Sequence, residues 1–67
     1  MNLVTDHIGS LAVVRVNETR LTYPLLPEFT SAVASVIGGG YRNVLLELSA
    51  VTYVDSATVG CLVDLSR

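Results

Sequence analysis

The stretch that decides the fold of this chain is Val54-Asp55-Ser56-Ala57-Thr58-Val59-Gly60. It follows an apolar segment, residues 44–48, whose near-continuous hydrophobic run is typical of a buried strand. Asp and Ser are favoured at helix N-caps because their oxygens accept hydrogen bonds from free backbone N–H groups of the first turn. The stretch therefore predicts a strand-to-helix junction, with a second helix that begins near Ser56.

Ser56 is the candidate functional residue at this junction. The positive end of a helix favours negative groups, so a phosphate on Ser56 would be accommodated there. Two interpretations are open: Ser56 is an unmodified N-cap, or it is a regulatory phosphoacceptor. Asp55 is a second capping oxygen, with a secondary role in orienting Ser56 for a kinase. Thr58 is a further hydroxyl in the first turn and an alternative phosphate acceptor.

Gly60 lies inside the second predicted helix, where a glycine lowers helix stability by about 1 kcal/mol relative to alanine. Such a cost indicates either close packing inside the chain or the close approach of a partner, and we expect packing.

The chain upstream of the junction predicts a β-hairpin. Two short apolar runs, Leu3–Ile8 and Leu11–Val16, are separated by Gly9-Ser10, and a two-residue Gly-X link between such runs is a hairpin signal. Both faces of the second run are mostly apolar, so we expect it to be covered on both sides. The polar residues 17–22 that follow are expected to form a loop.

An amphipathic helix is predicted between the hairpin and residues 44–48. Its apolar residues recur at steps of three and four: Leu26, Phe29, Val33, Val36 and Ile37. Pro24 and Pro27 bracket its start, since proline is tolerated in a first helical turn. The three glycines at residues 38–40 are expected to end it. Strand, helix and strand in this order suggest a right-handed parallel crossover.

These elements predict an α/β fold, a β-hairpin leading into a βαβα unit, in one domain over residues 1–67. We expect this layered domain to be incomplete at its C-terminal side. The strand at residues 44–48 would then have an apolar, unpaired edge, which invites association. A homo-oligomer is expected, formed through this edge or through the apolar face of the first helix around Phe29 and Val33.

Composition excludes several function classes. The net charge is −2, with four arginines and no lysine, so no basic stripe for nucleic acid is present. No apolar run reaches the roughly 18 residues that suggest a membrane span. Cys61 and His7 make no metal-ligand pattern, and no cofactor is expected. A reduced cytoplasmic location fits the lone thiol. There is no GxSxG around Ser56, no P-loop and no carboxylate pair beside a base, so an enzyme is not expected.

The same elements resemble the STAS domain, the family of anti-sigma-factor antagonists. Members of that family often read hydrophobic-Asp-Ser-Ser-Gly-hydrophobic-Gly after a strand of this kind. The residues that match are Asp55, Ser56, Val59 and Gly60. Ala57 replaces a common second serine, and Thr58 replaces a common glycine. The order of elements matches the first part of the family fold.

The resemblance implies a function. In that family the matching serine is phosphorylated by a partner anti-sigma factor that is itself a kinase, and phosphorylation breaks the complex. It implies that Ser56 is this serine and that Asp55, Ser56, Ala57 and Thr58 contact the partner. The alternative is a STAS scaffold or interaction domain without a switch, as in a stress-signalling assembly or the cytoplasmic tail of an anion transporter.

Overall fold

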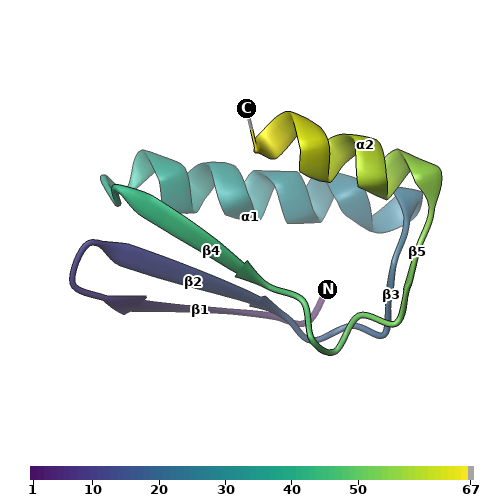
Figure 1. Cartoon of the computed structure of the whole chain (residues 1–67), viewed down its shortest axis with the longest axis horizontal. Helices are drawn as coiled ribbons and strands as arrows, with labels where there is room; N and C mark the ends of the chain where they lie inside the picture. The colour runs from purple at the N-terminus through teal and green to yellow at the C-terminus, as the bar shows by residue number, and fades with distance from the viewer. Residues whose placement is uncertain (67) are drawn as a thin grey trace.

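A three-stranded sheet with two helices on one of its faces forms the body of the molecule (Figure 1). The computed structural model describes residues 1–66. The sheet has the strand order β1-β2-β4, in which β1 (Leu3–Ile8) is antiparallel to β2 (Leu11–Val16) and β2 is parallel to β4 (Asn43–Glu47). The helices are α1 (Leu26–Gly38) and α2 (Ser56–Leu65). The predicted hairpin and βαβα order are confirmed.

The hairpin turns where the sequence indicates. Ile8 pairs with Leu11 and Leu3 pairs with Val16, so Gly9 and Ser10 alone form the connection. Gly9 has φ of 59°, a left-handed conformation that glycine adopts without the steric cost of a Cβ atom. In this register, the side chains of paired residues on β1 and β2 lie on the same face of the sheet.

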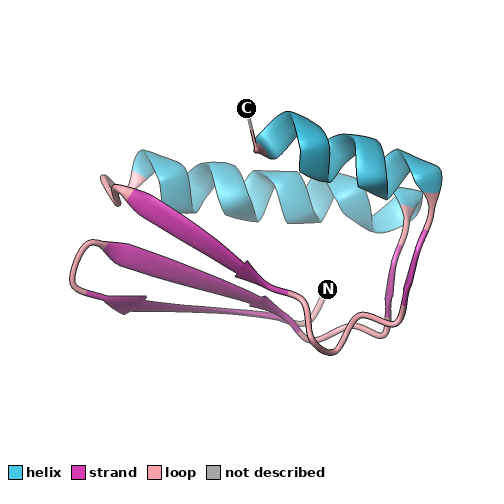
Figure 2. Ribbon diagram, in the orientation of Figure 1, coloured by secondary structure: helices cyan, strands magenta, loops and turns pink. Residues whose placement is uncertain are grey.

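The polar segment after the hairpin is not only a loop, as we had expected. Arg20–Leu21 forms a short strand, β3, which pairs in parallel with β5 (Tyr53–Val54). Figure 2 shows this strand pair leading up from the sheet to the helices. Two residues carry too little local pattern to predict a strand, because the pairing depends on a partner segment more than 30 residues away.

The start and end of α1 follow from the prolines and glycines around it. A single 3-10 turn, η1 (Tyr23–Leu25), contains Pro24 and leads directly into α1, which has Pro27 in its first turn. At the other end the Gly39 N–H donates to the Val36 carbonyl over 3.0 Å, and Gly40 takes a φ of 88° that reverses the chain toward β4. The predicted glycine stop is confirmed.

The core lies between the sheet and the helices. Its fully or nearly fully buried apolar residues are Ala12, Val14, Val16, Leu21, Phe29 and Val33. The second face of β2 was expected to be covered as well, and this prediction is wrong. Arg15 is exposed and Leu11 and Val13 are only half-buried, because both helices pack on the opposite face.

Burial also decides which surfaces are open to another molecule. Phe29 is 0% and Val33 is 3% exposed, so the apolar face of α1 around them is not free to associate, contrary to one of our expectations. No helix in the described part of the chain is long and apolar enough to cross a membrane.

Candidate functional site

The junction between β5 and α2 is fixed by the carboxylate of Asp55. The backbone of Asp55 is extended, and its Oδ1 atom accepts a hydrogen bond from the Thr58 backbone N–H over 2.9 Å. Asp55 is therefore the N-cap of α2, and Ser56 is the first residue inside the helix. The interpretation of Ser56 as the capping residue is corrected, and the capping role given to Asp55 is confirmed.

The same carboxylate also ties α2 to the other helix. Its Oδ2 atom accepts a hydrogen bond from the Tyr23 backbone N–H over 2.9 Å, at the start of η1. The hydrogen bond from the Thr58 side chain, followed by those from the Tyr23 and Thr58 backbone, holds the pKa of Asp55 below its usual range. Asp55 thus carries a negative charge at neutral pH directly before Ser56.

Thr58 lies inside the molecule. Its side chain is 0% exposed, and its hydroxyl oxygen is 2.8 Å from the Leu21 carbonyl oxygen and 2.7 Å from Asp55 Oδ1. The hydroxyl has one proton, so it donates to one of these two acceptors at a time. We had expected Thr58 on the partner-contacting surface and as an alternative phosphate acceptor. Its burial instead gives it a structural role, joining α2 to β3.

Ser56 and Ala57 are on the outside of the first turn. Both are exposed, and the Ser56 hydroxyl forms no hydrogen bond with any group in residues 1–66. The side chain that caps the helix and the side chain that is free to react are therefore different residues. Ser56 has a fixed backbone position and an unoccupied hydroxyl.

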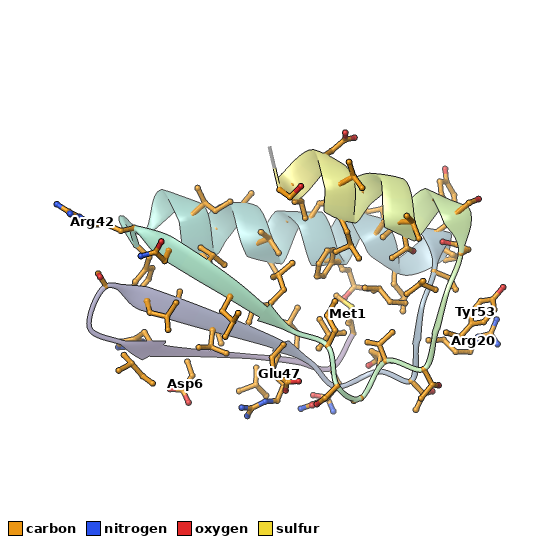
Figure 3. All side chains as sticks on the ribbon, in the orientation of Figure 1. Met1, Asp6, Arg20, Arg42, Glu47 and Tyr53 are labelled. Carbon is orange, nitrogen blue, oxygen red and sulfur yellow. The ribbon has the colours of Figure 1, made fainter. Side chains whose placement is uncertain are left out.

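An aromatic and cationic pair lies near this turn, and the sequence did not reveal it. The guanidinium carbon of Arg20 is 4.5 Å from the centre of the Tyr53 ring, an arrangement in which the cation is attracted by the ring face. Figure 3 shows both side chains on the outside of the β3–β5 ribbon. The pair arises because Arg20 and Tyr53 are register partners of two strands far apart in sequence.

Gly60 was expected to reflect close packing, and this prediction is wrong. A Cβ atom built on Gly60 meets no other atom within 4 Å. Together with Tyr23, Ala57 and Cys61, Gly60 borders a shallow groove between α1 and α2. The helix therefore presents bare backbone to this groove.

The remaining candidate residues carry no site in the described chain. Cys61 is half-buried and packs against the core, as expected of a small hydrophobic side chain. His7 is exposed on β1, where its ring lies 5.7 Å from that of Tyr41. Residues 1–66 contain no group of three or more His, Cys, Asp or Glu side chains that could hold a metal ion.

Comparison with known families decides the identity of the fold. The family model of the STAS domain matches residues 2–67, which is almost the whole chain. The chain belongs to the STAS domain family. Comparisons with curated proteins and with solved structures gave no match. The family assignment confirms the resemblance that rests on Asp55, Ser56, Val59 and Gly60. In this STAS domain these residues lie at the β5–α2 junction.

Proposed function

We propose that this STAS domain is an anti-sigma-factor antagonist. It is a binding module without catalytic activity that captures an anti-sigma factor in the cytoplasm. The anti-sigma factor has serine kinase activity, and it phosphorylates Ser56 to end its own capture. The proposal needs no cofactor, metal or nucleic acid.

The observation that carries the proposal is the state of Ser56. Its side chain is exposed and forms no hydrogen bond within the described residues, while Asp55 already caps α2 through the Thr58 backbone N–H. A kinase can reach this hydroxyl without unfolding the helix. A phosphate can be added without removing a contact on which the fold depends.

Electrostatic effects explain why phosphorylation of Ser56 should weaken partner binding and not strengthen it. A phosphoserine adds about −2 charge at pH 7 and would stand next to the ionised Asp55. The N-terminus of α2 offsets part of that charge, so the domain itself tolerates the phosphate. A docked partner would have to strip water from both charges, and this desolvation opposes binding. Phosphorylation is thus expected to end the complex and to leave the fold intact.

The proposed contact surface is the exposed part of the junction. It contains Ser56 and Ala57, with Asp55 at its edge, and excludes the buried Thr58. Tyr53 and Val59, each 49% exposed, flank it with apolar area. Partly exposed aromatic residues and arginines are enriched among the residues that dominate binding energy, so Tyr53 and its stacked Arg20 extend this surface.

Phosphorylation by an anti-sigma-factor kinase from the same genome tests the proposal. The protein is incubated with the kinase and ATP, and the site is mapped by mass spectrometry. We expect phosphate on Ser56 in the native chain and in Thr58→Ser, and none in Ser56→Ala. Phosphate on another residue would contradict the proposal. A kinase-type partner that binds but never phosphorylates the chain would instead favour the alternative, a STAS scaffold without a switch.

A further inference from the structure

Gly60 is a residue of α2 that the packing and backbone of residues 1–66 do not explain. It is exposed, a Cβ atom built on it meets no other atom within 4 Å, and it is not among the glycines with positive φ. Glycine also lowers helix stability relative to alanine. We propose that Gly60 is a specificity-determining residue for the phosphorylation of Ser56, because its missing side chain keeps the space beside the Ser56 hydroxyl open to the kinase. This inference rests on the proposed function.

The position of Gly60 relative to Ser56 follows from the helix itself. α2 begins at Ser56, so Gly60 lies four residues later on the same face of the helix. The Cβ positions of such a pair are about 5–6 Å apart. Because side chains in a helix lean toward its N-terminus, a long side chain at position 60 would extend over the preceding turn. A leucine or a glutamine there would lie beside the Ser56 hydroxyl.

Phosphoryl transfer needs this space. The Ser56 oxygen forms a bond to the γ-phosphorus of ATP, the bond from that phosphorus to ADP breaks, and the hydroxyl proton passes to a base of the kinase. The attacking and leaving oxygens must be roughly in line, so the kinase has to place ATP directly in front of the hydroxyl. The requirement holds for a chain of any length, because the space over Ser56 has to be free for the kinase whatever else the protein contains.

The open space continues from Ser56 along the side of α2. Ala57 and Gly60 border the shallow groove between α1 and α2, and Tyr23 borders it as well. Tyr23 is held there because its backbone N–H donates to Asp55 Oδ2 over 2.9 Å. A loop of the kinase can approach the helix backbone closely only where the side chains are small or missing. Gly60 therefore lets the kinase lie against α2 next to the hydroxyl that it modifies.

Thiol alkylation tests access to position 56 without a kinase. In a Cys61→Ala background, Ser56→Cys is treated with a bulky maleimide and with iodoacetamide, and the ratio of the two rates removes changes in thiol reactivity. Adding Gly60→Leu or Gly60→Gln should lower this ratio several-fold. Adding Asp64→Leu should not, because Asp64 is exposed on the same helix about 12 Å from Ser56 along its axis. Equal ratios in all these variants would overturn the proposal.

Kinetics with the kinase test the consequence for phosphorylation. We expect kcat/KM for phosphate transfer to Ser56 to be at least several-fold lower in Gly60→Leu and in Gly60→Gln than in the native chain. Gly60→Ala and Asp64→Leu should stay close to the native value, since neither side chain reaches the hydroxyl. Leucine and glutamine are better helix formers than glycine, so the Tm of the two long variants should be no lower than that of the native chain.

The outcomes separate this inference from the proposed function. Equal kcat/KM values for the native chain and Gly60→Leu, with phosphate on Ser56 in both, would overturn the role of Gly60 and leave the proposed function in place. A lower Tm in both long variants would also overturn that role, because Gly60 would then be a structural glycine. No phosphate on Ser56 in the native chain would overturn the proposed function and this inference with it.

Discussion

Asp55 Oδ1 lies 2.9 Å from the Thr58 backbone nitrogen and 2.7 Å from the Thr58 hydroxyl oxygen. One carboxylate oxygen thereby closes the first turn of α2 and meets a buried hydroxyl that also reaches the Leu21 carbonyl. The neighbouring Ser56 takes no part in this arrangement. The Thr58 hydroxyl therefore has a structural role, whereas the Ser56 hydroxyl remains accessible to solvent.

A permanent charge at Ser56 should weaken partner binding. In Ser56→Glu a carboxylate stands beside Asp55 and imitates part of the phosphate charge, whereas Ser56→Ala adds no charge. We expect titration calorimetry with the anti-sigma factor to show affinity at least several-fold lower for Ser56→Glu, and near-native affinity for Ser56→Ala. Equal affinities of the two variants would argue against an electrostatic switch.

Removing the cap should destabilise the junction. In Asp55→Ala the Thr58 and Tyr23 backbone N–H groups lose their acceptor, and loss of a helix cap in a domain of this size corresponds to a Tm decrease of about 5 °C. Asp64→Ala is the matched control, because Asp64 is an exposed residue of the same helix far from its N-terminus. Thermal unfolding followed by circular dichroism should show a decrease only for Asp55→Ala. Similar Tm values for the two variants would show that the cap is not important.

Stability should fall in acid through the same carboxylate. The hydrogen bonds of Asp55 lower its pKa in the folded state, so the unfolded chain binds its proton more readily. The stabilising contribution is therefore fully present above the ordinary pKa of about 4 and is lost as the pH falls through the folded value. Glu47, whose pKa is lowered by hydrogen bonds from Ser49 and then Arg15, contributes with the same sign.

Urea unfolding at a series of pH values checks this dependence. We expect a smaller acid loss in Asp55→Asn, which can still cap the helix but has no carboxylate to protonate. If the free energy of unfolding of Asp55→Asn falls in acid as steeply as that of the native chain, Asp55 is not among the groups that cause the acid loss of stability.

Loss of the Thr58 hydroxyl should destabilise the domain more than loss of the Thr58 methyl group. Thr58→Val keeps the volume but removes, in a buried site, the donor that the Leu21 carbonyl and Asp55 Oδ1 share, at a cost of about 1–3 kcal/mol in the free energy of unfolding. Thr58→Ser keeps the donor and loses one methyl group. Urea denaturation should therefore rank Thr58→Ser above Thr58→Val. The reverse order would show that packing of the methyl group dominates.

Gly60→Ala should stabilise the domain. Its new Cβ atom meets nothing within 4 Å, so only the gain in helix propensity remains, about 1 kcal/mol in the free energy of unfolding. Ala57→Gly, one turn earlier on the exposed side of α2, should change stability in the opposite direction. A destabilised Gly60→Ala variant would mean that this position is packed after all.

The sequence by itself determined the local elements and their order. Gly9-Ser10 defines the hairpin turn, the glycines at residues 38–40 end α1, and Asp55 with Ser56 marks the start of α2. Each of these signals acts within a few residues of where it is read. Turn geometry, helix period and capping are local physical preferences, so they can be recognised without knowing where the rest of the chain lies.

Only the tertiary structure decided which hydroxyl is free and which surfaces are covered. Thr58 is buried because β3 brings the Leu21 carbonyl to it across 37 positions of sequence, and Arg20 meets Tyr53 across 33. Both helices pack on one face of the sheet, which buries Phe29 and leaves the other face of β2 open. Such contacts depend on the pairing of distant segments, and no residue pattern within either segment encodes its partner.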